Sequence, residues 1–135
     1  MTSEEIAKNV ISVLEASGLP YMLVGAFSSN YYGIPRSTKD VDLVAELGDT
    51  PVTNLVSRLG PGYRLDPQIR FETNTGTTRH IVHVENSPFL VEIFRLSQDP
   101  HDQERFRRRV RVQMEGGETY VPTAEDVIIM KLRWA

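Results

Sequence analysis

The sequence predicts an α/β (α+β) fold, and three observations support this prediction. In the first 60 residues, segments with apolar residues at helical spacing alternate with short β-branched runs typical of strands. After Tyr63, strand-like runs follow one another, separated by turns rich in Thr, Gly, Asn and Pro. A last helical segment follows Thr123. We therefore expect helices packed on a sheet whose later strands form a meander.

The first helix is predicted between Thr2 and Gly18. Thr2 and Glu5 have the spacing of a capping box, apolar residues recur at helical spacing from Ile6 to Leu14, and Gly18 is suited to end the helix. The next elements are expected in this order: a strand over residues 21–24, a short helix over 26–32, a loop over 33–36, a strand over 39–45 and a helix over 52–59.

The second half is predicted to be mostly sheet. Strands are expected near residues 69–72, 80–84 and 90–96, followed by a hairpin that pairs 110–114 with 119–121 around Gly116-Gly117. Residues 122–126 are suited to cap a final helix. The chain ends at Ala135 within this helix, so we expect a truncation or an early stop there.

Length and composition limit the possible classes of protein. We expect a single domain over residues 1–135, because this length can bury a core without disulfides or structural metal. The chain has no Cys, no basic signal-peptide region and no apolar run of membrane-spanning length, so a cytoplasmic protein that does not bind membranes is expected. A net charge of −3 excludes a globally basic nucleic-acid binder but allows a local basic patch.

The most informative residues are two carboxylates, Asp40 and Asp42. On a strand their side chains point to the same face, where they repel each other. Such an arrangement indicates either a bound divalent metal or a raised pKa for one carboxyl group. Gly25 ends the preceding strand just before a predicted helix, whose first N–H groups are suited to bind phosphate. A metal site beside a phosphate-binding helix start, here called the phosphate cradle, is typical of enzymes that transfer nucleotidyl groups.

A third carboxylate, Glu92, is the only charge inside the apolar run from Phe89 to Phe94. Two interpretations are open: Glu92 belongs to the same metal cluster, or it is a structural residue paired with an arginine such as Arg95 or Arg70. The presence of Asp40 and Asp42 in the same sequence favours the interpretation as a metal cluster.

These motifs resemble those of the nucleotidyltransferase superfamily, whose core is the catalytic fold of DNA polymerase beta. The counterparts of the superfamily pattern are Gly25-Ala26, Asp40-Val41-Asp42 and Glu92. The runs Leu23-Val24-Gly25 and Tyr32 to Leu43 look like the small nucleotidyltransferases related to the AbiEii toxin family. The segment Pro122 to Leu132 resembles the helix that contributes a lysine, here Lys131, to the site in that family. The resemblance implies a mixed central sheet flanked by helices.

It also implies an activity: transfer of a nucleoside monophosphate from a nucleoside triphosphate to an acceptor hydroxyl, with Mg²⁺ or Mn²⁺. Asp40, Asp42 and Glu92 would bind metal, Asp42 bridging two ions and Glu92 lying nearer the acceptor. Lys131 would contact phosphate or a carboxylate, unless it is only a lysine at the edge of an apolar stripe. The acceptor would be the 3′ end of a tRNA or a partner protein, as in toxin–antitoxin systems with an antitoxin partner.

The phosphate cradle departs from the family pattern at Ala26, which lacks the usual Ser hydroxyl. Ser28 or Ser29 is placed to substitute for it. Arg36 and Lys39 would either contact the triphosphate or balance the acidic cluster. The departure at Ala26 keeps a second interpretation open: the protein is a degenerate member of the superfamily that binds nucleotide or a partner without turnover. A third interpretation is a transferase that modifies small antibiotics.

The only dense basic run lies between residues 105 and 111. If an extended segment begins at Phe106, the arginines at 105, 107, 109 and 111 project from one face and form a stripe suited to an RNA backbone. The alternative is a solvated edge strand, whose charges prevent aggregation.

Overall fold

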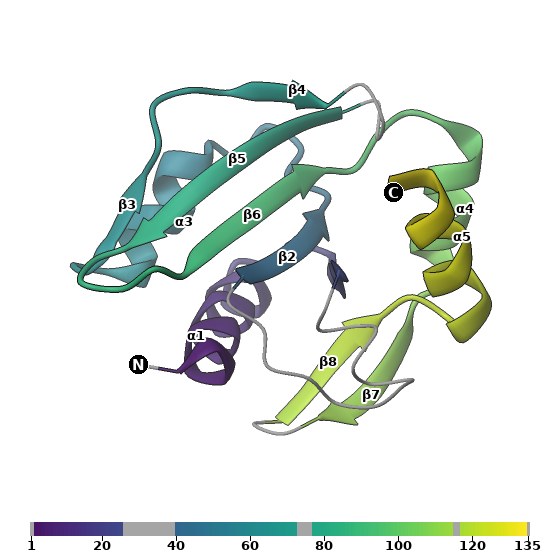
Figure 1. Ribbon diagram of the computed structural model, residues 1–135, viewed down its shortest axis with the longest axis horizontal. Coiled ribbons are helices and arrows are strands. Elements are labelled where there is room, and N and C mark those ends of the chain that lie inside the picture. Colours follow the sequence, from purple (N-terminus) through teal and green to yellow (C-terminus); the bar gives the residue numbers. More distant parts are fainter. Residues whose placement is uncertain (1, 26–39, 73–76, 115–116, 135) are drawn as a thin grey trace.

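The protein is built around a mixed β-sheet. The computed structural model describes residues 2–25, 40–72, 77–114 and 117–134. In this part of the chain the strands lie in the order β1 (Tyr21–Val24), β2 (Asp40–Ala45), β6 (Leu90–Arg95), β5 (Thr77–Val84) and β3 (Tyr63–Leu65), and β4 (Arg70–Glu72) also pairs with β5. The pairing of β2 with β6 is parallel and the other pairings are antiparallel (Figure 1). The predicted mixed sheet is confirmed.

Helices and a hairpin pack on this sheet. The helices α1 (Ser3–Ala16) and α3 (Val52–Leu59) cover one face. The helices α4 (Pro100–Arg107) and α5 (Ala124–Trp134) place Phe106 and Met130 against the opposite face. In the sequence between α4 and α5, β7 (Val110–Met114) and β8 (Gly117–Val121) form a hairpin, which is a second sheet. Strand β8 of this hairpin lies beside β1. There the rings of Tyr21 and Tyr120 pack edge to face, with 5.7 Å between their centroids.

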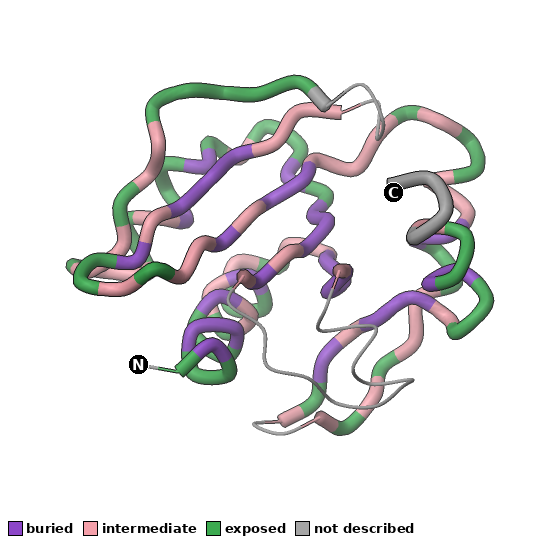
Figure 2. The backbone as a smooth tube through the Cα atoms, viewed as in Figure 1, coloured by how far each residue is buried: buried purple, intermediate pink, exposed green. Residues whose placement is uncertain are grey.

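The alternation of side chains along β2 decides where the functional face lies. Val41 and Leu43 are fully buried and pack beneath α1, in the main core. Asp40 and Asp42 therefore project from the other face, as successive side chains of a strand must. Figure 2 shows the buried segments running along the central strands. The acidic residues thus stand on a rigid, buried support.

The helix caps follow the sequence signals. The Glu5 N–H donates to Thr2 Oγ1 at 3.2 Å, and Gly18, with φ of 69°, lies just past the end of α1. The Asp126 N–H donates to Thr123 Oγ1 at 3.2 Å at the start of α5. The predicted first and last helices are therefore confirmed, as is the helix over 52–59.

Three differences from the predicted elements occur within the described residues. Helix α4 was not predicted, because its charged sequence lacks a clear apolar period; its signal is Asp99, which accepts from the N–H of His101 at 2.7 Å and precedes Pro100. Strand β3 was also not predicted, and β5 begins at Thr77, three residues before the predicted start at 80. The predicted helix over 26–32 and loop over 33–36 lie outside the described residues.

Candidate active site

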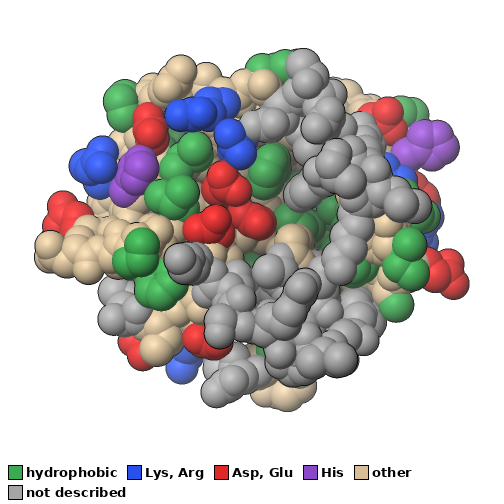
Figure 3. All heavy atoms as spheres, viewed as in Figure 1, with side chains coloured by type: hydrophobic (Ala, Val, Ile, Leu, Met, Phe, Trp, Pro, Cys, Tyr) green, Lys and Arg blue, Asp and Glu red, His purple; other side chains and the backbone are tan. Residues whose placement is uncertain are grey.

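The central feature of the site is a row of four residues across four strands. Val24 pairs with Asp42, Asp42 with Glu92 and Glu92 with Ile81, so that two carboxylates lie side by side between two buried apolar side chains. Asp42 and Glu92 are called the acid pair below. Figure 3 shows acidic side chains gathered near the middle of this face, with basic side chains beside them. The structure therefore brings together residues 50 positions apart.

The electrostatics of the acid pair are unfavourable for two negative charges. Burial raises the pKa of Asp42 to about 8, and the hydrogen bond to Glu92 and the charges of Glu92 and Asp40 act in the same direction. The charge of Arg79 opposes this increase in the pKa without cancelling it. The proximity of the two carboxyl groups and their burial therefore favour the protonated form of Asp42. The raised pKa predicted as one consequence of Asp40 and Asp42 is thus realised.

The two oxygens of Asp42 have different surroundings. Oδ1 is buried and has no hydrogen-bond partner among the described residues. Oδ2 lies against Gly25, where a Cβ atom would come within 2.5 Å of it. Gly25 also has a φ of 66°, a conformation that L side chains rarely adopt. Glycine is therefore required here, both for its backbone angle and for its close approach to the carboxylate.

Glu92 has a partner that the sequence did not identify. Arg79 Nη1 on β5 donates to Glu92 Oε1 at 3.1 Å. The expected partner Arg95 instead donates to His80 at 3.1 Å. Arg79 and Ile81 share the face of Glu92 because β5 and β6 are antiparallel with Ile81 opposite Glu92. Sequence alone does not specify this register, so no signal distinguished Arg79 from the other arginines.

The other expected site residues are described only in part. Asp40 begins β2, close enough for its charge to raise the pKa of Asp42. Lys131 lies on α5, but its side chain is outside the described part of the chain. Five further residues, all expected at the phosphate cradle or beside it, lie outside the described residues: Ala26, Ser28, Ser29, Arg36 and Lys39. Their roles stay predictions.

The fit of a divalent cation can be tested on the acid pair. Within the described ranges, no three His, Asp or Glu side chains stand close enough together to form a ready metal cage. The chemistry of the donors nevertheless fits Mg²⁺ or Mn²⁺, because both ions prefer oxygen ligands and Asp42 Oδ1 is a buried oxygen without a partner. A cation placed there would relieve the repulsion between the carboxylates. Asp42, Glu92 and Asp40 are the residues that would hold it.

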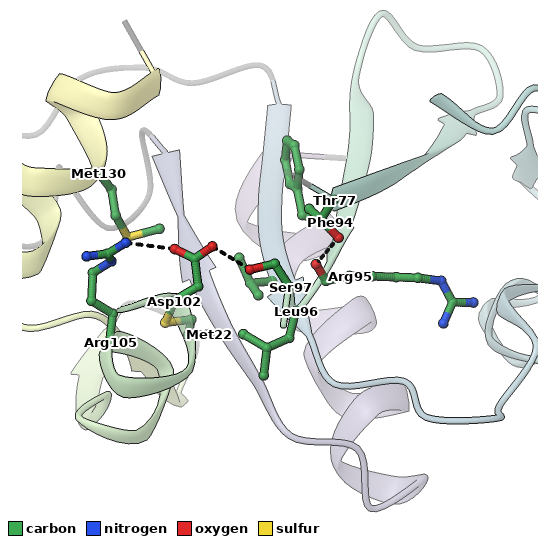
Figure 4. A pocket seen from close by; sticks show the side chains of 10 residues that line it. Met22, Thr77, Phe94, Arg95, Leu96, Ser97, Asp102, Arg105 and Met130 are labelled. Atoms are coloured by element: carbon green, nitrogen blue, oxygen red, sulfur yellow. Dashed lines mark hydrogen bonds and ion pairs between the residues drawn. The ribbon is translucent and has the colours of Figure 1, made fainter. Parts of the chain in front are cut away.

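A pocket lies on the same face, next to the acid pair (Figure 4). Its floor includes Met22, Val44 and Phe94, which form the adjacent row of the sheet. Its wall includes the ion pair of Asp102 Oδ1 with Arg105 Nη2, 2.7 Å apart, and Met130 of α5. The space in it that a water-sized sphere can occupy is about 30 Å³, which is enough for a water molecule or two but not for a whole small molecule.

The predicted arginine stripe is wrong, since Arg105 and Arg107 lie on helix α4 rather than on a strand. Arg105 is buried, and Arg107 pairs with Glu104 on its own helix. The other three arginines also have partners: Arg108 pairs with Asp126 at 2.8 Å, Arg109 stacks over Phe106 and Tyr120, and Arg111 pairs with Glu118 at 2.7 Å. The run holds α4, α5 and the hairpin together instead of forming one basic face.

The described helices include none that is long and apolar enough to cross a membrane.

Comparison with known proteins supports the fold through structure, not sequence. No family model and no curated protein sequence matches the chain. A provisionally assigned nucleotidyltransferase from Thermotoga maritima matches with a TM-score of 0.71 at 15% identity, over 99% of this chain and 87% of that one. The lincomycin-bound lincosamide antibiotic adenylyltransferase LnuA matches with a TM-score of 0.66 at 11% identity, over 95% and 85%. The antibiotic-resistance factor ANT(2'')-Ia matches with a TM-score of 0.61 at 12% identity, over 100% and 74%.

The chain therefore has the nucleotidyltransferase fold, as its motifs predicted. At these identities the likeness establishes the arrangement of the elements, while the chemistry has to be argued from the acid pair.

Proposed function

We propose that this protein is a metal-dependent nucleotidyltransferase, which moves a nucleoside monophosphate from a nucleoside triphosphate to an acceptor hydroxyl and releases pyrophosphate. The observation that carries this proposal is the acid pair, in which the parallel register sets Asp42 beside Glu92 and leaves Asp42 Oδ1 buried without a partner. Keeping such a group costs stability, which is reasonable where a cation is to be bound.

Each residue has a part in the proposed reaction. A divalent ion, when bound, lowers the pKa of the acceptor hydroxyl and neutralises charge on the phosphates. Asp40, Asp42 and Glu92 are proposed to hold this ion, and Glu92 on the neighbouring strand would also receive the proton of the acceptor. Gly25 lets the backbone approach the phosphates closely. Lys131 is proposed to contact the triphosphate from α5.

The acceptor can be a macromolecule or a small molecule. The proposed relation to AbiEii-type toxins supports the 3′ end of a tRNA or a partner protein as acceptor, in a cytoplasmic toxin–antitoxin pair with an antitoxin partner. The likeness to LnuA supports a small hydroxylated compound instead. The internal pairing of the arginines removes the argument for an RNA groove, which leaves the likeness to LnuA as the observation that favours a small acceptor.

A second candidate function is binding without turnover. It is favoured by Ala26, which stands where the family pattern has a Ser or Gly. Such a protein would bind nucleotide, or a partner, and leave the triphosphate intact. Retention of Asp40, Asp42 and Glu92 argues against it, because buried like charges without a cation are costly.

One experiment separates these candidates. The purified protein is incubated with each α-labelled triphosphate and Mg²⁺, together with tRNA, a cell extract or lincomycin in separate reactions. Label that enters RNA, protein or the small molecule identifies both activity and acceptor. The Asp42→Asn variant should transfer nothing, and Asp66→Asn, which changes a carboxylate outside the site, should transfer normally. Nucleotide binding without any labelled product would support the second candidate, and absence of both would contradict the proposal.

A further inference from the structure

Arg79 stands at the edge of the acid pair and carries the opposite charge. On β5 it lies opposite Phe94, in the row that continues through Val44 and Met22. The side chains of Arg79 and Glu92 are only 21% and 18% exposed, so water screens their 3.1 Å ion pair weakly.

Glu92 connects this arginine with Asp42. It accepts from Arg79 through Oε1, and it lies beside Asp42 in the parallel pairing of β6 with β2. Three strands, β5, β6 and β2, thus contribute one residue each to a chain of contacts that begins with a positive charge. A second cation entering this group would meet the charge of Arg79 at close range, and like charges at such distances repel measurably.

We propose that Arg79 is a built-in counter-ion that weakens the binding of a divalent cation to the acid pair. This inference rests on the proposed function, because it assumes that Asp42 and Glu92 bind the metal. Before the cation binds, Arg79 compensates part of the acidic charge and stabilises the fold. When the cation binds, Arg79 has to share Glu92 with it. Removal of the arginine charge should therefore destabilise the metal-free protein and strengthen the binding of the cation.

The chain offers a matched control in Arg95. It is also an arginine, on the strand that carries Glu92, and its Nε atom donates to His80 at 3.1 Å. His80 and Arg95 alternate with Ile81 and Phe94, so this pair lies on the opposite face of the sheet from the acid pair. Arg95→Gln therefore removes the same charge without removing a neighbour of Glu92.

The test is titration of Mn²⁺ alone into the chelator-treated full chain at low ionic strength. It compares wild type with Arg79→Gln, Arg79→Lys, Arg95→Gln and Asp42→Asn. We expect Arg79→Gln to bind Mn²⁺ about three- to tenfold more tightly, the effect of removing one nearby like charge that is partly exposed. Arg79→Lys and Arg95→Gln should stay within about twofold of wild type, since each keeps the positive charge beside Glu92.

Thermal unfolding gives the second readout. Without metal, Arg79→Gln should unfold at a lower temperature than wild type, and saturating Mn²⁺ should close most of the difference. If Arg79→Gln folds only when Mn²⁺ is present, this result also supports the proposal, because the metal then replaces the missing positive charge. Unchanged or weaker Mn²⁺ binding by Arg79→Gln, or failure to fold even with Mn²⁺, would overturn the role of Arg79. If Asp42→Asn binds Mn²⁺ as tightly as wild type, the proposed function itself fails.

Discussion

Two charged regions of this molecule differ in how their charges are compensated. Between residues 105 and 111, arginines meet carboxylates or aromatic rings: Arg105 pairs with Asp102, and Arg108 with Asp126. In the acid pair, two carboxyl groups face each other, and the pKa of Asp42 rises to about 8. The comparison teaches that the density of charge in a sequence does not mark a site. Incomplete compensation does, because Arg79 offsets only part of the charge of the acid pair.

The difference has a physical origin. The arginine partners lie on the same helix or on elements packed directly against it: Arg105 and Arg107 pair within α4, and Arg108 pairs with Asp126 of α5. Asp42 and Glu92 come from two parallel strands that must pair for the sheet to form, so their repulsion is forced by the fold. Unfavourable arrangements of this kind persist where function needs them.

The largest expected effect concerns Asp42. Asp42→Asn should reduce nucleotidyl transfer by about a thousandfold or more, because it removes a charged ligand of the proposed metal. Without metal it should unfold at a higher temperature than wild type near pH 8, since the buried repulsion disappears. Activity assays and thermal unfolding check both expectations. Normal activity in Asp42→Asn would contradict the role of the acid pair.

Gly25→Ala is expected to have the next largest effect. The added Cβ would lie 2.5 Å from Asp42 Oδ2, and the φ of 66° adds strain. Gly18→Ala is the matched control, because Gly18 has a φ of 69° but no atom within 4 Å of the added Cβ. Both variants should lose about 1–2 kcal/mol from the backbone angle. Only Gly25→Ala should also lose transfer activity, and equal activity in the two variants would contradict the contact with Asp42.

The arginine region supplies a matched pair of its own. Arg105 and Arg107 both lie on α4 and both pair with a carboxylate three residues earlier, but their side chains are 10% and 73% exposed. Arg105→Gln should lower the free energy of unfolding by about 2–3 kcal/mol, because Asp102 loses a partly buried partner. Arg107→Gln should change it by less than about 0.5 kcal/mol. Denaturant unfolding measures both, and equal losses would contradict the structural role of Arg105.

A further expected effect is a dependence of stability on pH. Asp42 titrates near pH 8 in the folded chain and near its ordinary value of 3.8 when unfolded, so the folded state holds an extra proton between these values. The stability of the chelator-treated protein should therefore fall as the pH rises from about 4 to 8. The Tm of the wild type should fall by at least several degrees over this range. Asp42→Asn should flatten this profile, and an unchanged slope would assign it to other groups.

Much of the fold and part of the site could be predicted from the sequence. The acid pair was found because alternation on a strand places Asp40 and Asp42 on one face, and Glu92 interrupts an apolar run. Arg79 could not be found, since the antiparallel register of β5 and β6 depends on tertiary pairing. Helix α4 was missed because its charged residues show no apolar period, although Asp99 and Pro100 mark its start.

The most direct test of the central claim is calorimetric titration of Mn²⁺ into wild type and into the Asp40→Asn, Asp42→Asn double variant, with Asp66→Asn as control. Asp66 contacts His83 at 3.1 Å and is not among the groups that raise the pKa of Asp42. If the acid pair binds the metal of a nucleotidyltransferase, wild type and Asp66→Asn should bind Mn²⁺ alike and the double variant should bind it at least tenfold more weakly, about 1.4 kcal/mol or more. Equal binding by all three proteins would contradict the claim.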